Sequence, residues 1–150
     1  MNRYMEEALK EAKKAYKKKE VPVGAIILKD GKIIAKAHNL RERKKSALAH
    51  AEILAIKKAC KKLKSWRLDG TQMYVTLEPC PMCAGALILA RVSKVYIGSI
   101  DEKNGCIVSK SKILDVDTTH KVEYEFLEDS FECSKILKDF FSQLRKAKKK

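Results

Sequence analysis

The sequence predicts an α/β fold built on one mixed sheet of about five strands. The dipeptide Asp30-Gly31 separates two apolar runs, and a two-residue Asp-Gly turn joins antiparallel strands. Later, two short apolar runs flank a helical segment at 81–91, and a strand–helix–strand crossover joins parallel strands. A sheet that contains both kinds of pair is mixed, and the helical segments supply the layers that cover it.

The first part of the chain has the pattern of a helix followed by a hairpin. Apolar residues recur at helical spacing over about 3–18 with lysines between them, which indicates a surface helix with one buried side. The run 23–28 is apolar throughout and predicts a strand buried on both faces. Residues 33–37 are expected to pair with it across the turn.

A second helix and a third strand follow a polar, basic connection at 39–47. Apolar residues return at helical spacing over 48–62, and Ser46 is the expected N-cap of this helix. The segment 73–77 predicts the third strand.

The crossover helix is expected at 81–91, because Pro79 and Pro81 mark its beginning. A fourth strand is expected at 95–98. No clear period marks 99–120, so this segment is predicted to be a loop with a short helical turn near Ile113 and Leu114.

Alternating apolar and acidic residues at 122–126 predict a fifth strand with one exposed face. Asp129 and Glu132 then predict a capped final helix. The basic tail at about 145–150 is expected to fray.

Length and composition indicate a single domain over 1–150 with an adequate core, since 45% of the residues are hydrophobic. The 33 Lys and Arg residues outnumber 19 Asp and Glu, and the net charge of +14 favours polyanionic partners, with a solvated lysine-rich surface as the alternative. The N-terminus lacks the features of a secretory signal, and no apolar run is long enough to span a membrane. Cys60, Cys106 and Cys133 are scattered, which fits a reduced compartment, so a cytoplasmic protein is expected.

Two motifs carry the chemistry: His50-Ala51-Glu52 and Pro79-Cys80-Pro81-Met82-Cys83. They supply three zinc ligands, His50, Cys80 and Cys83, and one carboxylate outside the ligand set, Glu52. Three protein ligands leave a fourth position for water, and zinc lowers the pKa of that water towards ~7. Glu52 is then available to move protons. These parts fit hydrolytic deamination of an amino-substituted ring.

His50 and Glu52 are two positions apart, and such side chains diverge by about 200° on a regular helix. They can share a pocket only near an irregular helix start, which is therefore the predicted arrangement. Each residue also has an ordinary alternative. A single histidine or glutamate is usually structural, and a Cys-x-x-Cys pair that opens a helix after a strand is also the arrangement of a redox dithiol.

The motifs resemble the signature of zinc-dependent nucleobase deaminases of the cytidine/deoxycytidylate deaminase superfamily. Nearly the whole chain is similar to the bacterial tRNA-specific adenosine deaminase family. The blocks that carry this resemblance are Val21-Pro22-Val23-Gly24-Ala25, Ala49-His50-Ala51-Glu52-Ile53, Thr76-Leu77-Glu78-Pro79-Cys80 and Met82-Cys83-Ala84-Gly85-Ala86.

The resemblance implies a three-layer α/β/α cytidine-deaminase-like fold, a homodimer, one Zn²⁺ per subunit and conversion of the wobble adenosine of a tRNA anticodon to inosine. It also implies that Asn39 contacts the target nucleoside and that Asp101 and Lys103 lie beside the RNA, although a polar surface turn is the alternative for the last two. A base in a loop can enter a pocket without opening a duplex. Basic residues would contact phosphates, namely Arg41, Arg43, Lys44, Lys45 and those of the C-terminal helix.

The chain departs from the family pattern at 46–48, before the histidine, and at 106–110, after Gly105. Two further functions remain open at this point. One is a deaminase of a free nucleobase or nucleoside, such as cytosine or guanine. The other is a non-catalytic RNA-binding subunit that keeps zinc only for structure.

Overall fold

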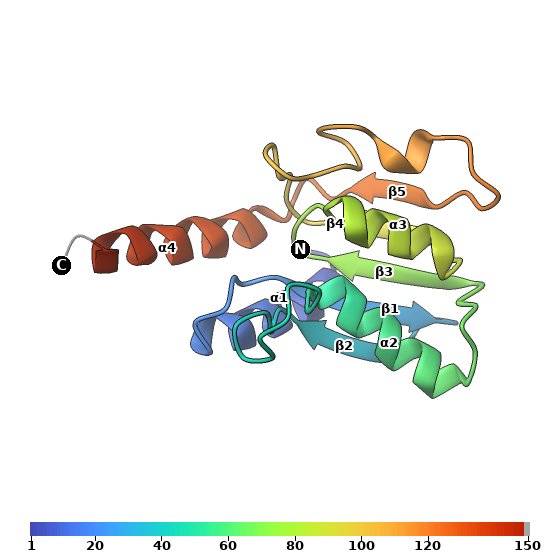
Figure 1. The fold of residues 1–150 in the computed structure, drawn as a ribbon, viewed down its shortest axis with the longest axis horizontal. Helices are drawn as coiled ribbons and strands as arrows, with labels where there is room; N and C mark the ends of the chain where they lie inside the picture. The colour runs from blue at the N-terminus through green and yellow to red at the C-terminus, as the bar shows by residue number, and fades with distance from the viewer. Residues whose placement is uncertain (149–150) are drawn as a thin grey trace.

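The computed structural model describes residues 1–148, which form a mixed five-stranded sheet between helical layers (Figure 1). Helices α2 and α3 cover one face, and α1 with the beginning of α4 packs on the other. The elements in chain order are α1 (Arg3–Lys17), β1 (Gly24–Lys29), β2 (Lys32–His38), α2 (Ala51–Leu63), β3 (Thr71–Val75), α3 (Pro81–Leu89), β4 (Lys94–Ile97), a 3-10 helix (Ile113–Asp115), β5 (Glu123–Phe126) and α4 (Phe131–Lys148). The predicted three-layer α/β/α fold is confirmed.

The strand order is β2-β1-β3-β4-β5. Strand β1 pairs antiparallel with β2 and β3, whereas β3–β4 and β4–β5 are parallel, as the hairpin and the crossover predicted. Asp30 and Gly31 have φ of 51° and 75°, the geometry of a type I′ turn. Because β3 and β4 are parallel, the segments that follow them leave the sheet at the same end, where both strands finish. The backbone N–H of Glu78 donates to the carbonyl of Ser99 there, at 2.8 Å.

Helix α1 lies very close to the start of β1. Asn2 caps this helix by accepting the N–H groups of Tyr4 and Met5. Where α1 crosses the sheet, a Cβ on Gly24 would collide with the backbone of α1. Glycine at this position therefore sets the helix-to-sheet distance.

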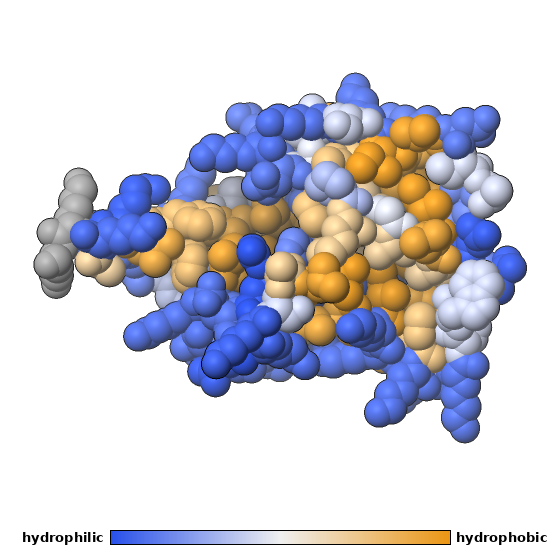
Figure 2. Space-filling view, viewed as in Figure 1, coloured by the Kyte–Doolittle hydropathy of each residue, from blue (hydrophilic) through white to orange (hydrophobic). Residues whose placement is uncertain are grey.

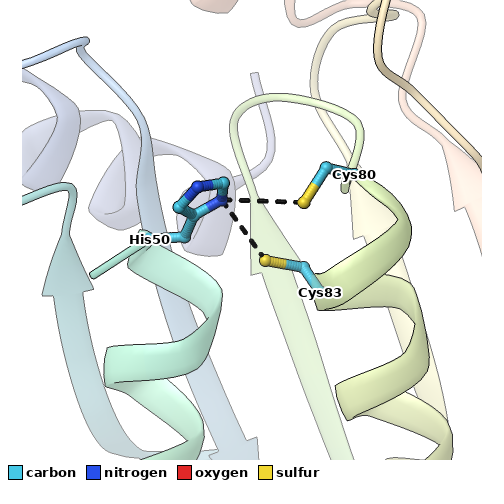
Figure 3. Close-up of side chains that lie close together, drawn as sticks. All are labelled: His50, Cys80 and Cys83. Atoms are coloured by element: carbon cyan, nitrogen blue, oxygen red, sulfur yellow. Dashed lines mark hydrogen bonds between the residues drawn. The ribbon is translucent and has the colours of Figure 1, made fainter. Parts of the chain in front are cut away.

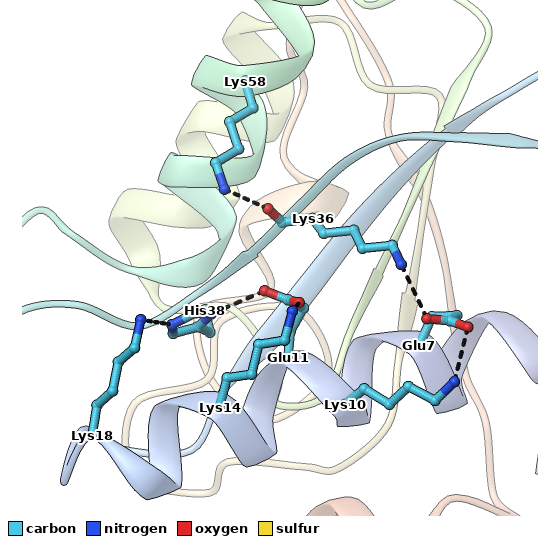
Figure 4. A network of polar contacts seen from close by, with 8 residues as sticks. All are labelled: Glu7, Lys10, Glu11, Lys14, Lys18, Lys36, His38 and Lys58. Atoms are coloured by element: carbon cyan, nitrogen blue, oxygen red, sulfur yellow. Dashed lines mark hydrogen bonds and ion pairs between the residues drawn. The ribbon is translucent and has the colours of Figure 1, made fainter.

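Polar contacts fix α1 to β2 as well (Figure 4). Lys36 forms an ion pair with Glu7 at 3.2 Å, and Nδ1 of His38 lies 2.9 Å from Oε1 of Glu11. Glu11 and His38 are both buried, so their contact is shielded from water. It holds the end of β2 immediately before Asn39.

The second helix begins later than predicted. Helix α2 starts at Ala51, and Leu48 lies in the preceding turn with 60% of its surface exposed. The N-cap position belongs to His50, and the hydroxyl of Ser46 instead accepts the N–H of Leu48. The predicted Ser46 cap was wrong, because 46–49 forms turns of its own before the helix.

Two strands also differ from expectation. Strand β3 occupies 71–75 instead of 73–77, because the chain bends at 76–77. All four residues of β5 are exposed, although one buried face was predicted. As one of the two outer strands, β5 is paired on one side only, and its residues lie outside the main core. The helical turn expected near Ile113 is present.

Helix α4 begins at Phe131 with Glu132 in its first turn, so Ser130 and not Asp129 directly precedes the helix. Asp129 instead lies 3.7 Å from the N-terminal amino group. The expected frayed tail is helical to Lys148 with exposed side chains, and 149–150 lies outside the described residues. Figure 1 shows α4 extending away from the sheet, beyond the ends of β3 and β5.

Figure 2 shows a broad apolar area on the face formed by α2 and α3. Helix α3, Pro81–Leu89, contains no charged residue. Its outward side includes Met82, Gly85, Ala86 and Leu89, and Leu89 is 73% exposed. A helix that is apolar all round is normally buried. This face therefore lacks the polar surface that a solvent-facing helix normally has.

Candidate metal centre and active-site cleft

Three potential metal-donor atoms, one imidazole nitrogen and two sulfurs, meet at the N-terminal ends of α2 and α3 (Figure 3). His50 and Cys80 occupy the N-cap positions of α2 and α3, and Cys83 lies in the first turn of α3. Nδ1 of His50 lies 3.7 Å from the sulfur of Cys80 and 3.6 Å from that of Cys83. A nitrogen and a sulfur that bind one tetrahedral zinc ion are about 3.6 Å apart. The three residues therefore have the spacing of a single metal site.

The electrostatics of this cluster also suit a cation. Hydrogen bonds with Cys83 and His50 lower the pKa of Cys80 to about 4, and the bond to Cys80 raises the pKa of His50. The neighbouring Cys80 group and burial raise the pKa of Cys83. Two adjacent thiolates repel each other, and a bound dication removes that repulsion. One imidazole and two thiols thus form a donor set that fits a metal ion.

Glu52 lines the same cleft as His50 and Cys80. The backbone of His50 is extended, with φ of −77° and ψ of 150°, so the 200° divergence of a regular helix does not apply to this pair. The predicted irregular helix start is confirmed. Glu52 is only 4% exposed, and burial raises its pKa to about 7. A carboxyl group with such a pKa exchanges its proton near neutral pH.

Asn39 fixes the beginning of α2 from the end of β2. Its side-chain oxygen accepts the N–H of Ala51 at 2.8 Å, and the N–H of Leu40 donates to the carbonyl of Ala49. Both contacts flank His50. Asn39 therefore orients the segment that carries His50 and Glu52. It caps the start of α2, where Ser46 was the predicted capping residue.

The cleft above the cluster has a volume of about 1350 Å³. Arg41 lines this cleft, and so do Asp101 and Lys103, which lie in the loop after β4. One side of α4 completes the lining with Leu137, Lys138, Phe141, Leu144, Arg145 and Lys148. The predicted site residues Asn39, His50, Glu52, Cys80, Asp101 and Lys103 thus share one cleft, with Cys83 buried against it.

Two parts of this cleft were not predicted. The apolar residues of α4 were expected only as a helix stripe, yet Phe141 remains 41% exposed and lines the cleft. Glu78 received no role, although it directly precedes the Pro79-Cys80 motif. Burial would raise the pKa of Glu78, but hydrogen bonds from Ser109, Val108 and Asp101 hold it below the usual value. The available signal in the sequence was the position of a glutamate directly before the Pro79-Cys80 motif.

A three-layer α/β/α fold with a metal-type cluster and a buried carboxylate at two helix N-termini defines a deaminase of the cytidine-deaminase-like class. The family model for MafB19-like deaminases matches residues 1–145. The chain belongs to this family and, within it, to the tRNA-specific adenosine deaminases.

The relatives that show this are similar over almost their whole length. The chain is 52% identical to the tRNA-specific adenosine deaminase of Bacillus subtilis (strain 168), covering 97% of this chain and 91% of that protein. It is 50% identical to the enzyme of that name from Aquifex aeolicus (strain VF5), with coverage of 95% and 94%. A solved structure from a study of A-to-I editing by tRNA:A34 deaminases superposes with a TM-score of 0.86 at 39% identity, covering 89% and 98% of the two chains.

Proposed function

We propose that this protein hydrolytically deaminates adenosine to inosine at the wobble position of a tRNA anticodon, with one Zn²⁺ per subunit. The main structural support is Glu52 beside the His50–Cys80–Cys83 cluster in an open cleft. The relatives named above supply the nature of the substrate. Free-base deamination has less support, since the guanine deaminase of Bacillus subtilis is 28% identical with a TM-score of 0.64.

In this proposal His50, Cys80 and Cys83 hold the metal. When bound, Zn²⁺ lowers the pKa of water enough for attack at neutral pH. Glu52 accepts a proton from the attacking water and passes it to the ring nitrogen next to the amino-bearing carbon. It then takes the second proton from the hydroxyl group added to that carbon and transfers it to the departing amine, so that adenosine and water give inosine and ammonia. Its burial keeps these transfers away from bulk water.

The cleft is suited to an RNA loop because its walls combine positive charge with exposed apolar side chains. Arg41, Lys103 and the basic residues of α4 can neutralise phosphates. Phe141 offers a ring on which an unpaired base can stack. We propose that Asn39 contacts the target nucleoside from the cleft wall and that Asp101 and Lys103 lie beside the RNA.

The test of this function is to incubate the zinc-loaded protein with an anticodon-arm RNA bearing a wobble adenosine, in parallel with free adenosine, cytidine and guanine. Inosine should form only in the RNA, and affinity should fall roughly 10-fold or more between about 50 and 200 mM salt. An arm with guanosine at the wobble position is the matched control. Turnover of a free base at a rate insensitive to salt would instead establish the alternative function.

We further propose a homodimer that buries the apolar face of α2 and α3. The support is the uncharged α3 and the exposure of Leu89. A two-fold axis would place the same face of a second copy against it, so that both apolar faces are covered at once. Burial of such a face is favourable because apolar surface leaves water.

Replacing Leu89 with glutamate should weaken the dimer by about 100-fold or more, because the charge would lose its hydration in the interface. Light scattering after size exclusion should then show a monomer. Phe131→Glu is the control, since Phe131 is 69% exposed but lies at the start of α4. A dimer that persists in the Leu89 variant, or that the Phe131 variant disrupts equally, would contradict this interface.

We place residues 1–150 in one deaminase domain and the protein in the cytoplasm, where tRNA substrates are found. The match of the family model to residues 1–145 supports the first proposal. Among residues 1–148, no helix is long and apolar enough to cross a membrane.

A further inference from the structure

The carboxylate of Glu78 is buried at the edge of the cleft and accepts five hydrogen bonds from one loop. Oε2 accepts the N–H groups of Ile107, Val108 and Ser109 at 3.1, 2.7 and 2.9 Å. Oε1 accepts the N–H of Asp101 at 3.0 Å and the hydroxyl of Ser109 at 2.7 Å. Glu78 is 2% exposed, so water does not compete strongly for these bonds.

These donors come from both ends of the loop 101–109, and the carboxylate therefore closes the loop on itself. Four of the five donors are main-chain groups, so this arrangement does not depend on the side chains at 106–108. The fit is tight as well, because a Cβ on Gly105 would collide with the carboxylate of Glu78. Hydrogen bonds to an ionised group are among the stronger ones in proteins.

The ordering continues from Asp101 to the cleft. Oδ1 of Asp101 accepts the N–H groups of Lys103 and Asn104, both at 3.1 Å. Asp101, Lys103 and Asn104 all line the cleft. Glu78 thus fixes the backbone of Asp101, and Asp101 fixes the backbone of Lys103.

Residues 78–80 contain both Glu78, which supports the loop, and Cys80, a member of the metal-type cluster. Glu78 is separated from Cys80 only by Pro79, and the carbonyl of Pro79 accepts the N–H of Cys106 at 3.1 Å. The loop wall and the cluster are therefore held in a fixed relation to each other.

We propose that Glu78 is a positioning residue: its carboxylate presets the loop 101–109 so that Lys103 already faces the cleft before RNA binds. This inference deepens the proposed function and rests on it for the identity of the RNA. A loop that is already ordered loses less conformational entropy on binding. Losing the carboxylate should therefore raise KM for RNA far more than it lowers kcat.

The test is Glu78→Gln in the full-length, zinc-loaded protein. Glutamine has the same shape as glutamate, but its amide NH₂ is a donor. It would face N–H or hydroxyl donors of the loop and could not accept their hydrogen bonds. In the RNA-free protein, amide exchange at 107–109 should become roughly 10- to 100-fold faster. KM for the wobble-adenosine arm should rise roughly 10-fold with kcat changed less than about 3-fold and zinc content unchanged. Ser109→Ala removes only the hydroxyl bond and should give a smaller shift in the same direction.

Gly105→Ala is the second variant, because it disturbs the same contact while leaving Glu78 and its link to Cys80 intact. It should also raise KM, which keeps the test decisive if the Glu78 variant folds poorly. Unchanged exchange at 107–109, or a loss of kcat and zinc without a change in KM, would overturn the proposal. If the wild-type protein fails to deaminate RNA, the proposed function is wrong, and exchange together with RNA affinity still decides the role of Glu78.

Discussion

Glu52→Gln is expected to lower kcat on wobble-adenosine RNA by about 10²- to 10⁴-fold, the usual contribution of a general acid–base group. Glutamine preserves the shape of this buried side chain but cannot accept and release the proton. Because the carboxylate lies outside the proposed ligand set, zinc content and RNA affinity should stay near wild-type values. Single-turnover deamination, metal analysis and RNA titration measure the three quantities separately.

Glu128→Gln provides the control, since it makes the same side-chain exchange at an exposed glutamate outside the cleft. It should behave like the wild type. Full activity in the Glu52 variant would support the non-catalytic RNA-binding alternative, in which zinc serves only structure.

Cys83→Ser is expected to remove the metal, and activity with it. Serine is a poor ligand for zinc, and its hydroxyl lacks the charge of a thiolate. Zinc should fall from about one per chain to near zero, and turnover should drop more than about 10³-fold because water returns towards its ordinary pKa of about 15.7. Added zinc should stabilise the wild type but not the variant. At a zinc concentration of 100 times Kd, the free energy of unfolding of the wild type should rise by about 2.7 kcal/mol, and its Tm should rise with it.

Cys60→Ser is the matched control, because Cys60 lies on α2 outside the cluster. It should keep both its zinc and its response to added zinc. A redox dithiol would behave differently: the wild type would carry no zinc, and Cys80 and Cys83 would cycle between thiol and disulfide.

The elements that the sequence predicted well have strong local signals. Helix α1 has lysines between apolar residues at helical spacing, and Asp30-Gly31 tolerates the positive φ angles of a tight turn. The crossover helix begins at Pro81, where the missing N–H costs nothing. Each of these signals acts within a few residues, so it survives without knowledge of the rest of the fold.

The misplaced elements depend on distant contacts. Leu48 fits the apolar spacing of α2, but Asn39, from the end of β2, caps the helix at Ala51. The alternation in β5 is real, but a strand at the edge of the sheet has little core to pack against. Helix α4 continues to Lys148, and its apolar residues line the cleft as well as the core.

The sequence by itself predicted the chemistry proposed for this protein, because His50, Glu52, Cys80 and Cys83 lie in two short motifs that together resemble the signature of nucleobase deaminases. Only the tertiary structure decided how those groups are held. The capping of α2 by Asn39 and the loop gathered around Glu78 each join residues that are far apart in the chain. Residue types fix what a side chain can donate or accept, whereas the position at which it does so is set by the packing of the whole sheet and its helices.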